Sequence, residues 1–163
     1  TTTGEICFNT SMTGYQEILT DPSYAGQVIT FTTPHIGNIG CNDDDFEAVK
    51  PHCAGLIIRE LPTQPSNFRS EMSLQAWLEK HNITGICNVD TRAITRHIRK
   101  HGAQNVVIFS VQNAEFKVQL EAAKKALAAA PNMKGLDLAK PVTTKNAYEW
   151  TDSLWRLDSS TRH

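Results

Sequence analysis

Residues 5–33 read EICFNTSMTGYQEILTDPSYAGQVITFTT, and this stretch decides the fold class. Its two ends, residues 5–10 and 27–33, are rich in β-branched and aromatic residues and are bounded by Gly or Pro, which is typical of strands. Between them, residues 15–19 predict a helical turn. It stops before the Asp-Pro pair at 21–22, because proline disfavours the α conformation in the preceding residue. This alternation of strands and helical turns indicates an α/β domain.

The alternation continues along the chain, with further strands predicted at residues 53–59, 83–89 and 106–111. Helices are predicted from apolar residues that recur at i, i+3, i+4 and i+7 behind a capping residue. These helices are Leu74, Trp77, Leu78 and His81 behind Ser73; Thr91 to His101 behind Asp90, with Ile94 and Ile98 buried; and Phe116, Leu120, Ala123 and Leu127 behind Asn113. We expect one domain over residues 1–131 and an extended connector over residues 132–163.

Length and charge bound the possible partners. The chain has 163 residues and a mass of 18.1 kDa, enough for one domain with a packed core. Lys and Arg number 16 against 17 Asp and Glu, and this balance argues against nucleic acid or an anionic bilayer as partner. Neither a membrane-spanning run nor a signal peptide is found, so a cytoplasmic location is expected. The chain starts with Thr rather than Met, which indicates that it was cut from a longer protein.

Four cysteines stand far apart without a C-x-x-C pair, so neither a zinc site nor a disulfide framework is predicted. Cys87 follows Gly85 between a predicted strand and a predicted helix, where a nucleophile elbow would place its thiol. The second small residue of such a turn is missing, because Val89 occupies that position. We therefore favour a buried structural thiol over a catalytic nucleophile and predict no catalytic residue in this chain.

Two clusters carry metal-ligating side chains. His97 and His101 stand four residues apart on one predicted helix, a spacing that suits chelation, but the neighbouring arginines oppose a divalent ion. The acidic run at residues 43–45 lacks the alternating ligands and the glycine of a calcium loop. A solvated or interface helix face and a solvated loop are the favoured interpretations. No glycine-rich phosphate loop follows a strand, and we expect neither metal nor cofactor.

Two features indicate contacts outside the chain. Ser23 follows Pro22 in a turn, where its hydroxyl and backbone N–H suit a carboxylate ligand, although turns more often use serine locally. The helix at residues 91–101 has a cationic face without acids in the same turns, which indicates either an acidic partner or solvation. In the connector, Trp150 and Trp155 are expected to need a packing partner. The cationic face consists of Arg92, Arg96, Arg99 and Lys100.

The stretch FNTSMTGYQEILTDPSY, residues 8–24, closely resembles the N-terminal domain of the small, glutamine-hydrolysing subunit of carbamoyl phosphate synthetases. Further matches follow in the family's order and extend over nearly all of the chain. They are PHIGNIG (34–40), GLIIREL (55–61), SNFR (66–69), VDTRAITRHIR (89–99), GAQN (102–105) and LDLAKPVTTKNAYEW (136–150). The resemblance implies a three-layer β/β/α domain that precedes a class I glutamine amidotransferase domain.

In that family, the amidotransferase domain uses Cys, His and Glu to release ammonia from glutamine. A large subunit uses this ammonia to make carbamoyl phosphate for arginine and pyrimidine synthesis. This chain contains neither a GxCxG elbow nor an HxE motif, so the resemblance implies enzymatic activity only for the full-length protein. It also implies that Ser23, the serine of the DPSY motif, helps to hold L-glutamine. The expected partners are glutamine, the amidotransferase domain of the same polypeptide and the large subunit.

Two function classes stay open. The first is a non-catalytic scaffold that docks on the amidotransferase domain and on the large subunit. The second is a free-standing binding module. The cationic face and the two connector tryptophans favour the scaffold, because their expected partners are missing from these 163 residues. A reading frame that continues into a glutaminase elbow would support the scaffold, and a stop codon would support the module.

Overall fold

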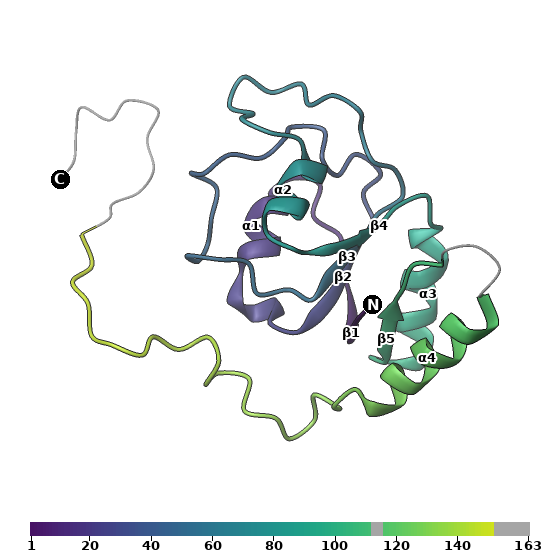
Figure 1. Ribbon diagram of the computed structural model, residues 1–163. Coiled ribbons are helices and arrows are strands. Elements are labelled where there is room, and N and C mark those ends of the chain that lie inside the picture. The colour runs from purple at the N-terminus through teal and green to yellow at the C-terminus, as the bar shows by residue number, and fades with distance from the viewer. Residues whose placement is uncertain (112–115, 152–163) are drawn as a thin grey trace.

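Five strands form one sheet in the computed structural model, which describes residues 1–111 and 116–151 (Figure 1). In chain order they are β1 (Thr2–Asn9), β2 (Gln27–Phe31), β3 (Gly55–Ile57), β4 (Thr84–Ile86) and β5 (Asn105–Ile108). The order across the sheet is β4-β3-β2-β1-β5. The first four strands are parallel, and β5 pairs antiparallel with β1.

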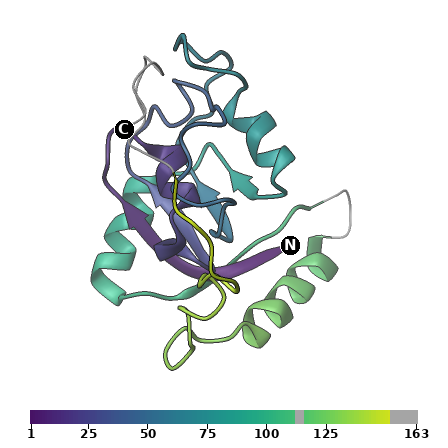
Figure 2. The same cartoon turned by 90° about the vertical axis from the view of Figure 1, so that its left-hand side faces the viewer.

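Helices pack on the sheet from both sides. The helical elements are α1 (Tyr15–Thr20), the 3-10 turn η1 (Pro22–Tyr24), α2 (Leu74–Lys80), α3 (Thr91–His101) and α4 (Phe116–Ala129). In Figure 1, α1 and α2 lie on one side of the sheet and α3 on the other, while α4 packs against the edge strand β5. The turned view shows α4 apart from α1 and α2, with residues 132–151 leaving from its end (Figure 2).

Alternate residues of the strands build two separate cores, because successive side chains of a strand face opposite sides of the sheet. Ile29 and Phe31 belong to the core under α1 and α2, where Trp77 is fully buried. Val28, between them in sequence, belongs to the second core. That core lies under α3 and consists of Ile6, Val28, Ile57 and Ile98.

The predicted caps of two helices are confirmed. The Ser73 hydroxyl accepts a hydrogen bond from the Ala76 N–H at 3.2 Å, and the Asp90 carboxylate accepts one from the Ala93 N–H at 2.9 Å. Each cap satisfies a backbone donor that the first helical turn leaves unpaired. Gly102 follows α3 with a φ of 81°, a backbone conformation that favours glycine.

The sheet curls strongly. The hydroxyl oxygens of Thr2 and Thr84 lie 2.5 Å apart, although β2 and β3 separate their strands in the sheet order. Close strand packing also requires Gly4, because a Cβ atom there would stand only 2.6 Å from the Gly26 carbonyl oxygen. The start of β1 therefore lies close to the edge strand β4.

The α/β prediction is confirmed, and the element bounds differ at their ends. β1 begins at Thr2, and the strands predicted at 53–59 and 83–89 shorten to three residues each. The predicted burial of Phe116 is wrong: its side chain is 52% exposed, because α4 rests mainly on β5 and turns its first residues outward. The described residues contribute one sheet, so the second β layer implied by the resemblance is not formed within them.

Candidate functional site

Ser23 occupies the middle of the η1 turn, and its backbone is already engaged. Asp21 caps the turn, and its carboxylate oxygen accepts the Ser23 N–H at 2.8 Å. Pro22 starts the turn, where its missing N–H costs nothing. Ser23 is exposed, and within the described part of the chain its hydroxyl has no hydrogen-bond partner. The hydroxyl, rather than the N–H, is therefore the group that Ser23 offers to a ligand.

Asn9, the last residue of β1, joins the Ser23 turn to the sheet. Its side-chain amide donates to the phenol oxygen of Tyr24 at 2.9 Å, and its side-chain carbonyl accepts the Ser11 N–H at 2.7 Å. Its backbone carbonyl accepts the Thr32 N–H at 3.1 Å. Three segments thus meet at one residue that the sequence analysis did not single out. The signal for it was the asparagine at a strand end two residues before a serine, where side-chain turns form.

The loops after β1 and β2 are exposed next to this junction. Residues 10–13 are exposed, Met12 at 81%, and Pro34 and His35 are exposed after β2. The Thr33 hydroxyl donates to the Ser11 carbonyl at 2.9 Å, so the two loops lie side by side. They stand at the carboxyl ends of parallel strands, the edge where open α/β sheets bind ligands.

The cationic face is fully solvent-facing, as its sequence predicts. Ile98 is buried and Ile94 half-buried against the sheet, while Arg92, Arg96, Arg99 and Lys100 are exposed. Within residues 1–111 and 116–151, none of these four cations lies within 4.0 Å of a carboxylate. Among the described residues, this face of α3 therefore carries four cations without an ion pair.

His97 and His101 lie beside the cationic face. Their ring centroids are 4.4 Å apart, and His97 Nε2 lies 3.3 Å from the Gln104 side-chain oxygen. A shallow hollow on this face is lined by the small residue Ala93 and by longer side chains that include both histidines. Among the residues described, no group of three or more His, Cys, Asp or Glu side chains is placed to hold a metal ion.

The acidic run lies at the surface, where Asp43 and Asp44 are exposed, and it also forms ion pairs that the sequence analysis did not predict. Arg69 Nη2 lies 2.7 Å from the Asp45 carboxylate and 3.7 Å from that of Asp44. Lys80 of α2 lies 3.2 Å from Asp43. The loops at 32–54 and 58–73 are joined by backbone hydrogen bonds between Cys41 and Met72, which brings Arg69 close to the acids. These ion pairs connect the acidic run to α2 and to the loop at 58–73.

Gln16 of α1 holds the loop at 32–54 through the backbone of Asn42. Its side-chain amide donates to the Asn42 carbonyl at 2.6 Å and accepts the Asn42 N–H at 3.0 Å. The Thr20 hydroxyl accepts the Glu47 N–H at 3.0 Å. Gln16 and Thr20 are buried. Their side chains therefore supply the hydrogen-bond partners that the loop backbone would otherwise find in a neighbouring strand.

Cys87 is half-buried rather than buried, which corrects its predicted environment. β4 ends at Ile86, so Cys87 stands just past a short edge strand and is covered mainly from the side of α2. It lines an apolar cleft of about 410 Å³ together with Leu56 and Leu78, and no histidine lines this cleft. The histidine that would activate a cysteine nucleophile is therefore not among the residues that line this cleft.

The other three thiols are held in their protonated form. Burial raises the pKa of Cys7 and that of Cys41 to about 12, with smaller contributions from nearby acidic groups. Burial also raises the pKa of Cys53 to about 11. All four cysteines are free thiols. Because the thiolate is the nucleophilic form, the raised pKa values make Cys7, Cys41 and Cys53 inert.

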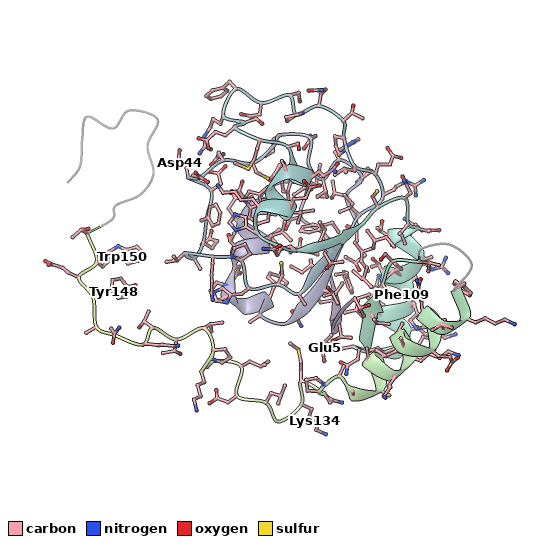
Figure 3. The ribbon with its side chains drawn as sticks, viewed as in Figure 1. Glu5, Asp44, Phe109, Lys134, Tyr148 and Trp150 are labelled. Atoms are coloured by element: carbon pink, nitrogen blue, oxygen red, sulfur yellow. The ribbon has the colours of Figure 1, made fainter. Side chains whose placement is uncertain are left out.

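Residues 131–151, which follow α4, are largely exposed. Trp150 is 72% exposed and Tyr148 63%, and their ring centroids are 6.2 Å apart. Figure 3 shows both side chains on this segment, away from the body of the domain. Trp155 lies outside the described residues.

No helix in the described ranges is long and apolar enough to cross a membrane.

Comparison with known proteins matches the chain to one family. Residues 1–108 match the family described as Carbamoyl-phosphate synthase small chain, CPSase domain. The chain is similar to proteins named Carbamoyl phosphate synthase small chain from Vibrio parahaemolyticus (53% identity over 96% of this chain) and Escherichia coli (52% over 94%). It spans about 40% of the length of these relatives. The recognition from sequence is confirmed: the chain belongs to the carbamoyl-phosphate synthase small chain family.

Proposed function

We propose that this chain is the scaffold part of a carbamoyl-phosphate synthase small chain. In the whole protein, an amidotransferase domain would release ammonia from glutamine, and a large chain would use it to make carbamoyl phosphate for arginine and pyrimidine synthesis in the cytoplasm. The observation that carries the proposal is the family match over residues 1–108. The Cys87 cleft has no histidine among its lining residues, which favours a non-catalytic role for this part of the protein.

Ser23 would contact glutamine in the whole protein. The resemblance assigns glutamine to the serine of the DPSY motif, and the local geometry supports a contact through the hydroxyl. Asp21 already uses the Ser23 N–H, so this backbone donor is not available to a carboxylate ligand. A neutral hydroxyl that donates to a charged group makes one of the stronger hydrogen bonds in proteins.

The cationic face would dock on the large chain. Four cations on one helix, all exposed and without a carboxylate within 4.0 Å among the described residues, favour an acidic surface as partner. Their charge does not hold α3 on the sheet, because Ile94 and Ile98 make that contact. Trp150 and Trp155 would pack against the amidotransferase domain of the same polypeptide.

Two assays test the proposal. The full-length small chain, assembled with its large chain, is expected to make carbamoyl phosphate from glutamine or from ammonia. The chain of 163 residues alone is expected to release no ammonia from glutamine, because no activated nucleophile stands in its described part. Ammonia release by this chain that disappears in Cys87→Ser would contradict the scaffold role. A complex that uses ammonia but not glutamine would contradict the ammonia-supply role.

A further inference from the structure

We propose that Asn9 is a positioning residue for Ser23 and acts through the phenol of Tyr24. The inference rests on the proposed contact between Ser23 and glutamine and adds the residue that sets where that contact is made. Asn9 and Tyr24 are joined by a hydrogen bond of 2.9 Å between the Asn9 amide nitrogen and the phenol oxygen. Tyr24 is the neighbour of Ser23 in the chain, so this bond acts on the turn that carries the serine.

The bonds inside the turn define its shape but not its place. Asp21 accepts the Ser23 N–H, the Tyr24 N–H donates to the Asp21 carbonyl, and the Ala25 N–H donates to the Pro22 carbonyl. All three bonds join residues that lie within five positions of one another. Within the described residues, the bond from Tyr24 to Asn9 is the side-chain hydrogen bond that ties residues 21–25 to a distant element.

The sheet holds Asn9 in place. It ends β1 and lies opposite Phe31 in the register with β2. Phe31 is fully buried. The Tyr24 ring packs, half-buried, against the core under α1 and α2. A hydrogen bond from such a strand transfers the rigidity of the sheet to an exposed three-residue turn.

The orientation of the Asn9 amide is determined by its second partner. The Ser11 N–H can only donate, so the Asn9 side-chain oxygen must face it, at 2.7 Å. The NH₂ group therefore faces Tyr24 and donates to the phenol oxygen. Aspartate or alanine at position 9 could not supply this donor. The arrangement also leaves the phenol hydrogen of Tyr24 available for a further acceptor.

A misplaced contact group costs affinity even when the group itself is intact, because binding depends on its distance and direction. Removing the bond is therefore expected to weaken glutamine binding without touching the ammonia-dependent reaction. Tyr24→Phe is the sharpest variant, since it deletes the phenol oxygen and keeps the packed ring. We expect it to raise the KM for glutamine about three- to tenfold, the range of one neutral hydrogen bond.

The experiment compares variants of the full-length small chain in complex with the large chain. Tyr24→Phe, Asn9→Ala, Ser23→Ala and the double variant Ser23→Ala/Tyr24→Phe are assayed for kcat and KM with glutamine and for the rate with ammonia. Ser66→Ala is the matched control, because it deletes an exposed hydroxyl hydrogen bond, 3.2 Å to the Asn38 carbonyl, that does not involve Asn9, Ser11 or the Ser23 turn. The double variant is expected to lose no more than Ser23→Ala, because Tyr24 acts through Ser23.

Three results would overturn the inference. If Ser23→Ala raises the KM for glutamine and Tyr24→Phe does not, Asn9 does not position Ser23 and the glutamine contact itself stands. If losses in the double variant are additive, Tyr24 acts by another route. If Ser23→Ala leaves the KM for glutamine unchanged, the proposed glutamine contact fails and the positioning role fails with it.

Discussion

The carboxylate of Asp21 lies 2.8 Å from the backbone nitrogen of Ser23 and accepts its hydrogen. This contact consumes the backbone donor of the residue to which the family resemblance assigns glutamine. It leaves the hydroxyl as the group through which Ser23 would act. Because the Ser23 N–H is already bound to Asp21, replacing the Ser23 side chain alone tests whether Ser23 contacts the ligand.

Ser23→Ala in the full-length protein is expected to weaken glutamine use about ten- to a hundredfold and to leave ammonia-dependent synthesis intact. The lost bond to a charged ligand group corresponds to ~1.5–3 kcal/mol. Carbamoyl phosphate formation with each nitrogen donor is the measurement. Ser110→Ala, another exposed serine, is the control. Equal losses with glutamine and with ammonia would show a folding defect and would contradict the contact.

Reversing Arg96 and Arg99 to Glu is expected to slow association with the large chain, most strongly at low salt. Opposite charges across an interface accelerate association and are screened by ions. The melting temperature should barely change, because exposed charges contribute little to folding. Binding kinetics at two ionic strengths, beside a thermal melt, measure both effects. The control reverses Lys125 and Lys134, which are also exposed. An unchanged association rate would rule out docking through this face.

Gln16→Ala is expected to destabilise the fold by about 1–3 kcal/mol for each backbone group that loses its partner. The Gln16 amide pairs both the N–H and the carbonyl of Asn42, and both residues are buried. Urea unfolding measures the change. Gln75→Ala, which removes an exposed contact to Glu79, should change stability by much less. Similar losses in both variants would mean that water replaces Gln16 at the Asn42 backbone.

Thiol labelling at pH 8 is expected to modify Cys87 first. Cys87 is half-exposed in its cleft, whereas Cys41 and Cys53 are buried with pKa values of about 12 and about 11. Mass spectrometry after timed alkylation gives the order of labelling, and rapid labelling of Cys41 in the folded chain would contradict it.

The raised pKa values of Cys41 and Cys53 also make the stability of the fold depend on pH, because the folded state keeps thiol protons that the unfolded state loses. The contribution of these two thiols to the free energy of unfolding is fully present below about pH 8.5. It is lost as the pH rises towards 11 and 12.

Much of the fold follows from local sequence. The β-branched runs around Val28 and Leu56 fall in strands, and Ser73 and Asp90 cap the two helices predicted to follow them. These signals are local, because strand propensity, apolar period and capping act over a few neighbouring residues. The exposure of the cationic face follows in the same way from the spacing of Ile94 and Ile98.

Features that depend on distant partners did not follow from the pattern. The ion pairs of the acidic run are not visible in the sequence, because Arg69 reaches Asp45 from a loop 24 residues away and Lys80 reaches Asp43 from a helix 37 residues away. Phe116 looks buried, yet α4 packs mainly against the edge strand β5 and leaves this side chain 52% exposed. Cys87 looks buried, yet β4 ends one residue before it. Each of these outcomes depends on which element covers the residue.

The sequence by itself determined the α/β class, the helix caps, the charged face of α3 and, through its motifs, the family. Local periodicity and residue identity carry this information. Only the tertiary structure decided that Asn9 meets Tyr24. The bond from the Ser23 N–H to Asp21 is local, because it joins residues two positions apart. The Asn9 contact bridges 15 positions of chain, and the pairing of β1 with β2 creates it, so the residues around either partner do not encode it alone.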